Sequence, residues 1–177
     1  NTFRTNLQWN SGRSASGWAA EGRVSTVMSD GWVDRASSDL SSFQLGLNRV
    51  WDGGSMTYTI LSGRERTYQS WWGVPEVALN GSEDEIRTWG QNNGYSEQQI
   101  DDLVNSGRQA NYYTYEDQVD NYGQDHQQLH LEHQFGDWRL SATSHFTHGE
   151  GYFEEFKGGE DLAAYLLPDV VVGDDTV

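Results

Sequence analysis

Period-two alternation of apolar and polar residues recurs in six segments of this chain and constrains the fold more than any other feature. In the first segment, Phe3, Leu7 and Trp9 fall on odd positions and polar residues on the even ones. Such alternation is typical of a β-strand with one apolar and one polar face. It predicts an all-β fold, an antiparallel meander of about six strands at roughly residues 3–10, 18–28, 40–51, 56–68, 125–135 and 137–148.

The connections between these segments alternate in length. Three are tight, with the sequences NSGRSAS, DGGS and GD, and two of them contain the hairpin-favouring dipeptides Asp52-Gly53 and Gly136-Asp137. The others are SDGWVDRASSD, a loop over about residues 69–124, and the tail from residue 149. The pattern predicts short turns at one end of the sheet and long loops at the other.

The longest loop carries helix signals. SEDE and SEQQ each place a serine three residues before Glu or Gln, which is the capping-box pattern. Ile100, Leu103 and Val104 follow the second serine at helical spacing, and Gly107 is a stop signal. We expect one or two short helices between Ser82 and Gly107.

Large aromatic residues gather at the short-turn end of the predicted sheet: Trp9, Trp18, Trp51, Phe135 and Trp138. Tryptophan prefers the interface between a membrane and water, so a row of these rings predicts a membrane-interface belt. Apolar residues six to nine positions away lie ~20–30 Å along the strands, about the height of an outer-membrane apolar band. The pattern therefore favours strands from a transmembrane β-barrel, with short helices in a long outer loop.

The composition excludes several classes of protein. A net charge of −16 argues against nucleic-acid binding, and the absence of cysteine excludes disulfides and thiolate metal sites. Eight Trp, nine Tyr and six Phe are too many aromatic residues for a disordered chain, although the mean hydropathy is only −0.78. The chain opens at Asn1 inside a periodic pattern, from which we expect a processed chain or an internal fragment.

Four segments between residues 21 and 167 occur in the following order: EGRVSTVMSDGWVDRASSDLSSF, GRERTYQSWWGVPE, NYYTYEDQVDNYGQDHQQLHLEHQF and HFTHGEGYFEEFKGGEDLAAYLL. They resemble consecutive strand and loop pieces of TonB-dependent outer-membrane receptors, and the resemblance runs over most of residues 1–167. The resemblance implies a plugged barrel of 22 strands in the outer membrane of a Gram-negative bacterium. It also implies import of a scarce nutrient such as an iron–siderophore complex or cobalamin, without enzymatic activity or a cofactor.

Several parts of that family's pattern are missing from the chain. There is no TonB box, no plug domain and no terminal strand ending in an aromatic residue, and six strands cannot close the barrel. We therefore expect residues 1–177 to be a partial barrel with an extracellular loop at about 69–124. The expected partners are outer-membrane lipid and a small ligand such as a metal chelate, with the TonB system reached only through the missing plug. The flanking reading frame is expected to encode that plug and more hairpins.

Histidines suggest a metal site, but the predicted strand spacing argues against one. His126 and His130 share a strand face about 13 Å apart, too far for one ion, and His133 points to the other face. A turn at Gly136-Asp137 predicts Gln128 opposite His145, with His130 diagonal to it. A hydrated lumen histidine is the preferred interpretation, so no metal site is predicted. Carboxylate pairs such as Glu154-Glu155 are interpreted as solvated loop charge.

Candidate ligand residues lie in and beside the longest loop. Trp71, Trp72, Tyr112 and Tyr113 either line a ligand vestibule or pack the loop against its own helices. Arg64 and Arg66, placed on the lumen face with Arg23 and Arg139, either attract an anionic chelate or balance acids such as Glu21.

The alternative from another class is a soluble β-sandwich that binds a ligand or carbohydrate through its loop aromatics. Its aromatic strand residues would form a core beneath a second sheet, and it would be monomeric without detergent. A hydrolase on a β scaffold is a third alternative that no motif supports.

Overall fold

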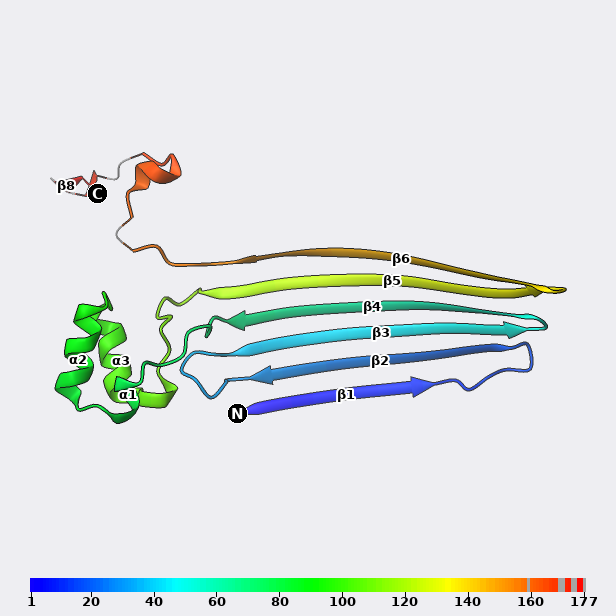
Figure 1. Ribbon diagram of the computed structural model, residues 1–177, viewed down its shortest axis with the longest axis horizontal. Coiled ribbons are helices and arrows are strands. Elements are labelled where there is room, and N and C mark those ends of the chain that lie inside the picture. Colours follow the sequence, from blue (N-terminus) through cyan, green and yellow to red (C-terminus); the bar gives the residue numbers. More distant parts are fainter. Residues whose placement is uncertain (159, 169–170, 173–174, 177) are drawn as a thin grey trace.

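The computed structural model describes residues 1–158, 160–168, 171–172 and 175–176, and its main element is a six-stranded antiparallel sheet. Each strand pairs with the next in sequence, as Figure 1 shows. The strands are β1 (Thr2–Asn10), β2 (Trp18–Ser29), β3 (Ser38–Trp51), β4 (Gly54–Tyr68), β5 (Val119–Phe135) and β6 (Trp138–Phe153). The predicted meander is confirmed. The sheet is open, because β1 and β6 each pair with one neighbour only.

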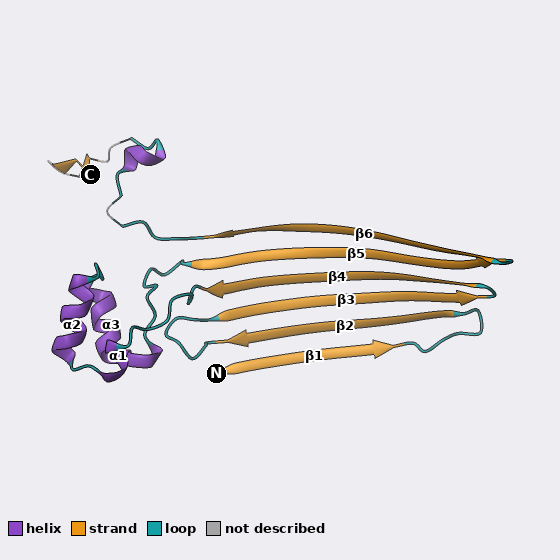
Figure 2. Ribbon diagram, viewed as in Figure 1, coloured by secondary structure: helices purple, strands orange, loops and turns teal. Residues whose placement is uncertain are grey.

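The two ends of the sheet differ as the connection lengths predict. The three tight turns lie at one end, and the long loops lie at the other (Figure 2). At the loop end the strands finish in one row of directly paired residues: Thr2, Ser29, Ser38, Thr67, Asp120 and Phe153. At the turn end they are staggered, because strand length rises from 9 residues in β1 to 17 in β5.

The strands β5 and β6 reach further toward the loops than the alternation predicts. β5 begins at Val119 and β6 ends at Phe153, whereas the apolar alternation covers only 125–135 and 137–148. The added residues carry polar side chains on both faces, so period-two hydropathy does not detect them. Backbone pairing with β4 and between the two strands extends them.

The longest loop folds into a small helical unit. It contains α1 (Val77–Asn80), α2 (Glu83–Asn92), α3 (Glu97–Ser106) and the 3₁₀ helix η1 (Gly107–Gln109). Both predicted capping boxes form, from Ser82 with Glu85 and from Ser96 with Gln99. The unit has its own apolar core of Ile86, Leu103 and Ala110, with residues such as Val77, Trp89 and Tyr95 packed around it. The sequence did not predict α1 or η1.

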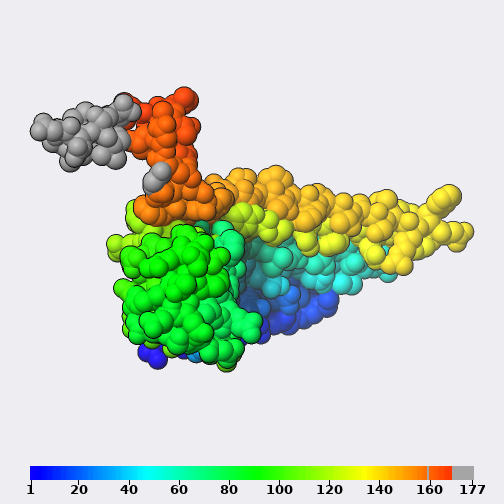
Figure 3. Space-filling model, turned by 60° about the vertical axis from the view of Figure 1, so that its left-hand side comes forward, coloured from blue at the N-terminus to red at the C-terminus, as the bar shows by residue number. Residues whose placement is uncertain are grey.

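Neither face of the sheet carries a second layer within the described part of the chain. Beyond β6 the described residues form the 3₁₀ helix η2 (Leu162–Tyr165) and two short strands, β7 (Val171–Val172) and β8 (Asp175–Thr176), which pair with each other. In Figure 3 the helical unit forms the bulkiest part, and the sheet tapers away from it. No described helix is both long and apolar enough to span a membrane.

Candidate functional site

Strand register divides the side chains of the sheet into two faces, because directly paired residues of antiparallel strands share a face. We call one side the band face and define it by the row that contains Trp9, Gly22, Leu45, Ile60, Gln127 and Phe146. The other side, the polar face, is defined by the row of Gln8, Arg23, Gln44, Leu61, His126 and Thr147.

The band face carries a continuous strip of exposed apolar side chains, which we call the apolar band. None of the residues that the structure describes covers it, and Trp138 is 80% exposed. Large exposed apolar patches on a protein surface mark contact with lipid or with another molecule. The exposed members of the band are Phe3, Leu7, Trp9, Trp18, Val24, Met28, Phe43, Leu129, Phe135, Trp138, Leu140 and Phe146.

The apolar band runs obliquely across the strands. One row of the band face is apolar in β1–β3, at Leu7, Val24 and Phe43, and polar in β4–β6, at Ser62, Asp125 and His148. The staggered turn end has the same slant, so both borders of the band slope in one direction. Between its outermost exposed members the band spans six residues on β1, from Phe3 to Trp9, and ten on β2, from Trp18 to Met28.

The aromatic belt at the turn end consists of Trp9, Trp18, Trp51, Phe135 and Trp138. Two residues beside these rings, Arg49 and His133, interrupt the apolar pattern of the sequence. The Arg49 guanidinium lies 5.2 Å from the Trp18 ring and 5.8 Å from the Trp51 ring, a cation–π geometry. His133 accepts a hydrogen bond at Nδ1 from Nε1–H of Trp51, and its ring lies against Phe135. Both polar groups are therefore accommodated among aromatic rings.

The structure brings together the four candidate loop aromatics, Trp71, Trp72, Tyr112 and Tyr113. The ring centroids are 5.6 Å apart for Trp72 and Tyr112, 5.5 Å for Tyr112 and Tyr113, and 6.0 Å for Trp71 and Tyr113. Tyr113 is only 5% exposed, whereas Trp71 and Trp72 are 60% and 63% exposed. Tyr113 thus packs the loop, while the two tryptophans face outward and are accessible to a ligand.

The register places Arg64 and Arg66 on the band face, beyond the apolar band on its loop side. The prediction that they share the polar face with Arg23 is wrong. The alternation of β4 continues unbroken past Ile60. Arg64 and Arg66 therefore lie on the same face as Ile60 and the apolar residues nearer the turn. Arg64 donates two hydrogen bonds to the Asp125 carboxylate, at 3.1 and 3.0 Å, and Arg66 lies 3.9 Å from that of Asp117. Neither arginine belongs to the aromatic cluster.

The residues that connect the 30–37 loop to the helical unit were not predicted from the sequence. Arg35 donates to the backbone carbonyls of Tyr113 and Asn111 and, at 2.7 Å, to the Asp102 carboxylate. The buried Asn111 donates to the carbonyls of Asp34 and Gln69. These contacts tie the 30–37 loop to the helical unit. In the sequence, Arg35 is a single arginine in a loop. That pattern is too common to predict a contact with an acidic helix.

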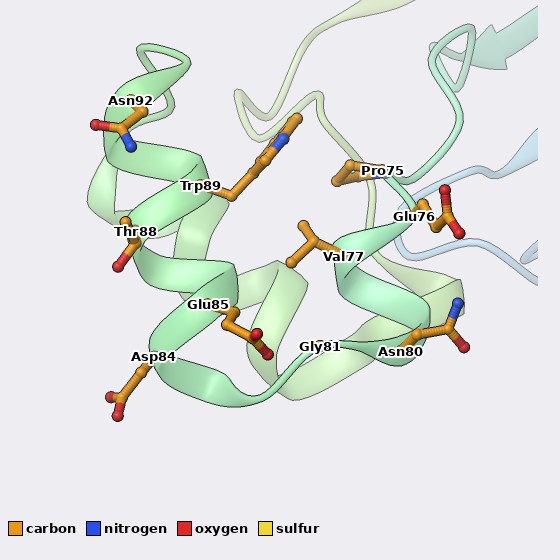
Figure 4. A pocket seen from close by; sticks show the side chains of 10 residues that line it. All are labelled: Pro75, Glu76, Val77, Asn80, Gly81, Asp84, Glu85, Thr88, Trp89 and Asn92. Atoms are coloured by element: carbon orange, nitrogen blue, oxygen red, sulfur yellow. The ribbon is translucent and has the colours of Figure 1, made fainter.

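A hollow of about 880 Å³ opens between α1 and α2 (Figure 4). Pro75, Val77 and Trp89 form its apolar side, and Glu76, Asp84 and Glu85 supply carboxylates. The Glu85 carboxylate accepts hydrogen bonds from the backbone N–H and the hydroxyl of Ser82, which lower its pKa. One of the three acids is thus committed to the helix cap, and the hollow is wide and open rather than a formed pocket.

No described group of three or more His, Cys, Asp or Glu side chains is arranged to hold a metal ion. No family model matches the chain, and no curated protein or solved structure matches it significantly. The geometry and the sequence resemblance therefore carry the functional argument.

Proposed function

We propose that this chain forms part of the wall and outer loops of a TonB-dependent receptor in the outer membrane of a Gram-negative bacterium. The receptor takes up a scarce nutrient such as an iron–siderophore complex. The observation that carries the membrane part of the proposal is the oblique apolar band. The receptor part rests on the four sequence segments that resemble the family.

The slope of the band fits strands that cross a bilayer at a tilt. The aromatic belt runs from Trp9 on β1 to Trp138 on β6. The residue of β6 that shares a row with Trp9 is Phe146, and Trp138 lies eight residues from Phe146 toward the turn end. Eight residues span ~26 Å along a strand, and the five strand spacings between β1 and β6 span ~24 Å, so the belt slopes at about 45° to the strand-pairing direction. Transmembrane barrel strands tilt by about 35–45°, which would make such a belt level in the membrane plane.

The charged part of the sheet fits a position outside the bilayer. Beyond the band, the band face carries Arg64, Arg66 and Asp125, and the helical unit with its many acids follows. In this orientation the tight turns face the periplasm and the loops face outward. The edges of β1 and β6 continue into further strands of the barrel, because open edges are untenable in lipid.

The outward-facing Trp71 and Trp72 supply the ligand-contact surface in this proposal. They lie at the loop end, and Trp71 also approaches Phe153 of β6, with ring centroids 6.1 Å apart. Two exposed indoles beside ordered tyrosines offer a flat apolar surface to an aromatic or chelating ligand.

The sandwich alternative requires a second sheet over the aromatic strand residues. The described chain has no such layer, and Trp9, Trp18 and Trp138 are exposed while Trp51 is half-buried. The same rings in water would form an unusually large apolar surface for a monomer. These features favour the membrane proposal.

Single-cysteine labelling tests which face meets lipid, and the chain has no native cysteine to interfere. Val24→Cys and Leu129→Cys probe the apolar band, and Ser25→Cys and Gln128→Cys are their neighbours on the polar face. With nitroxide labels in phospholipid vesicles, we expect band positions to be relaxed by oxygen and polar-face positions by a water-soluble chromium oxalate chelate. Equal chelate access at all four positions, or a monomer that stays in buffer without detergent, would overturn the proposal.

The reading frame around the coding sequence tests the receptor part separately. We expect an upstream plug domain and further downstream hairpins. Stop codons close to both ends would contradict the receptor assignment even if the band contacts lipid.

A further inference from the structure

We propose that His126 and His145, on the polar face of the β5–β6 hairpin, form a binding site for a transition-metal dication such as Zn²⁺ or Cu²⁺. His126 Nδ1 lies 3.2 Å from His145 Nε2, and the two rings are stacked with centroids 5.5 Å apart. The register confirms the expected pairing of Gln128 with His145, but the histidine that meets His145 is His126 and not His130.

The distance between the two nitrogens suits joint coordination. Imidazole nitrogens bind Zn²⁺ at about 2.0–2.1 Å, so two nitrogens 3.2 Å apart subtend an angle of about 100° at a shared metal ion. That angle lies between octahedral and tetrahedral values. Two histidines directly along one strand cannot achieve this, but two on neighbouring strands can.

A neighbouring side chain sets the tautomer that coordination needs. Gln124 Oε1 lies 2.9 Å from His126 Nε2 and accepts a hydrogen bond from Nε2–H, which leaves a lone pair on Nδ1 toward His145. Metal-binding histidines are usually oriented through their second ring nitrogen in this way. Thr147 Oγ1 lies 3.0 Å from both His126 Nδ1 and His145 Nε2 and can hydrogen-bond a water that completes the coordination shell.

The chemistry of the donors selects the class of metal. Imidazole suits Zn²⁺, Cu²⁺ and Ni²⁺, whereas Ca²⁺ and Mg²⁺ require several oxygen ligands. No carboxylate contacts either ring within the described residues. His130 bonds to Thr143 Oγ1 further along β5, so it provides a matched histidine on the same face. The site is local to one hairpin and does not depend on the proposed membrane function.

The test is titration of the 177-residue chain in detergent with ZnCl₂ at neutral pH by calorimetry. We expect one bound ion, at least tenfold weaker binding for His126→Gln and for His145→Gln, and unchanged binding for His130→Gln. Gln124→Leu should weaken binding by about tenfold through loss of ring orientation. Equal losses from His126→Gln and His130→Gln, or no binding by the unaltered chain, would overturn the site.

A second measurement needs no variant and therefore does not depend on folding of the substituted chains. Substoichiometric Cu²⁺ should broaden the ring resonances of His126 and His145 before those of His130, His133 and His148. The electron paramagnetic resonance spectrum should show two coordinated nitrogens. Simultaneous broadening of all five histidines, or a signal from one nitrogen, contradicts the proposal. Success or failure here leaves the cysteine-labelling result unaffected.

Discussion

The indole Nε1–H of Trp51 donates a hydrogen bond of 3.2 Å to Nδ1 of His133, which joins β3 to β5 across Gly54 of β4. The Trp51 ring lies so close over Gly54 that a Cβ atom there would come within 2.6 Å of it. The indole therefore fills the space that the glycine leaves and ties three strands together at the turn end.

Trp51→Phe tests this contact, because it keeps an aromatic ring and removes the donor. We expect a loss of about 0.5–1.5 kcal/mol in the free energy of unfolding, which is typical of one hydrogen bond. Urea unfolding followed by circular dichroism measures it. The control is Trp138→Phe, whose indole N–H has no partner in the described part of the chain. An equal loss in both variants would mean that ring size and not the hydrogen bond matters.

Arg35→Asn tests the attachment of the helical unit. Arg35 has φ 64°, a region that asparagine tolerates well, so this change removes the guanidinium with little backbone strain. Charged hydrogen bonds of this kind contribute about 1.5–3 kcal/mol, and we expect amide exchange in residues 107–118 to accelerate accordingly. Exchange in the strands should be unchanged.

The matched control for Arg35 is Arg87→Asn. Arg87 also bridges two carboxylates, Glu83 and Asp101, but on the exposed surface between α2 and α3. Exposed ion pairs contribute about 0–1 kcal/mol, so its loss should have a small effect. A larger effect from Arg87→Asn than from Arg35→Asn would contradict the proposed role of Arg35.

Charge substitution at adjacent positions of β2 tests the two faces energetically. Val24 lies in the middle of the apolar band, and Ser25 points to the polar face beside Ser42. If the band contacts lipid, Val24→Arg should cost about 2–4 kcal/mol of stability in a bilayer, and Ser25→Arg much less. Unfolding by urea in phospholipid vesicles measures the difference. Similar costs for both variants would indicate that both faces meet the same solvent.

The features predicted from the sequence are those that depend on near neighbours. Strand alternation, the Asp52-Gly53 and Gly136-Asp137 turns and the two capping boxes involve residues a few positions apart, and all formed as expected. The pairing of Gln128 with His145 followed directly from the turn. The sequence names Trp72 and Tyr112 only as candidate ligand residues of one loop, and their contact, with ring centroids 5.6 Å apart, is a finding of the structure.

The missed features depend on contacts that hydropathy does not encode. From the sequence we expect Arg64 on the polar face, whereas the unbroken alternation of β4 puts it on the band face. Arg35 meets Asn111, 76 residues later, through an ordinary loop arginine. The contact between His126 and His145 could not be predicted, because the register does not determine whether the side chain of His145 turns toward His126 or toward His130.

Alanine substitution in the first turn separates backbone strain from steric clash. Gly12 and Gly17 both have positive φ, of 67° and 85°, and a side chain there costs about 1–2 kcal/mol. A Cβ at Gly12 meets nothing within 4 Å, but at Gly17 it lies 1.9 Å from the Val50 carbonyl oxygen. Thermal unfolding should therefore rank Gly17→Ala as clearly worse than Gly12→Ala. The control Gly63→Ala, in an open strand position, should change little, and equal effects at 12 and 17 would rule out the clash.

The two helix caps differ in one titratable group, which predicts a pH response confined to α2. The hydrogen bonds from Ser82 lower the pKa of Glu85 from its ordinary value of 4.5, so the folded chain binds this proton less readily than the unfolded chain. The stabilisation is fully present above pH 4.5 and is lost as the pH falls through the lowered value.

In α3 the same position is Gln99, which does not titrate. Below pH 4.5, the protection of amides at the start of α2, relative to their exchange rates in an unstructured chain, should decrease as the pH falls while that at the start of α3 does not, and Glu85→Gln should remove the difference. Loss of protection at both helix starts at one pH would instead indicate unfolding of the whole helical unit.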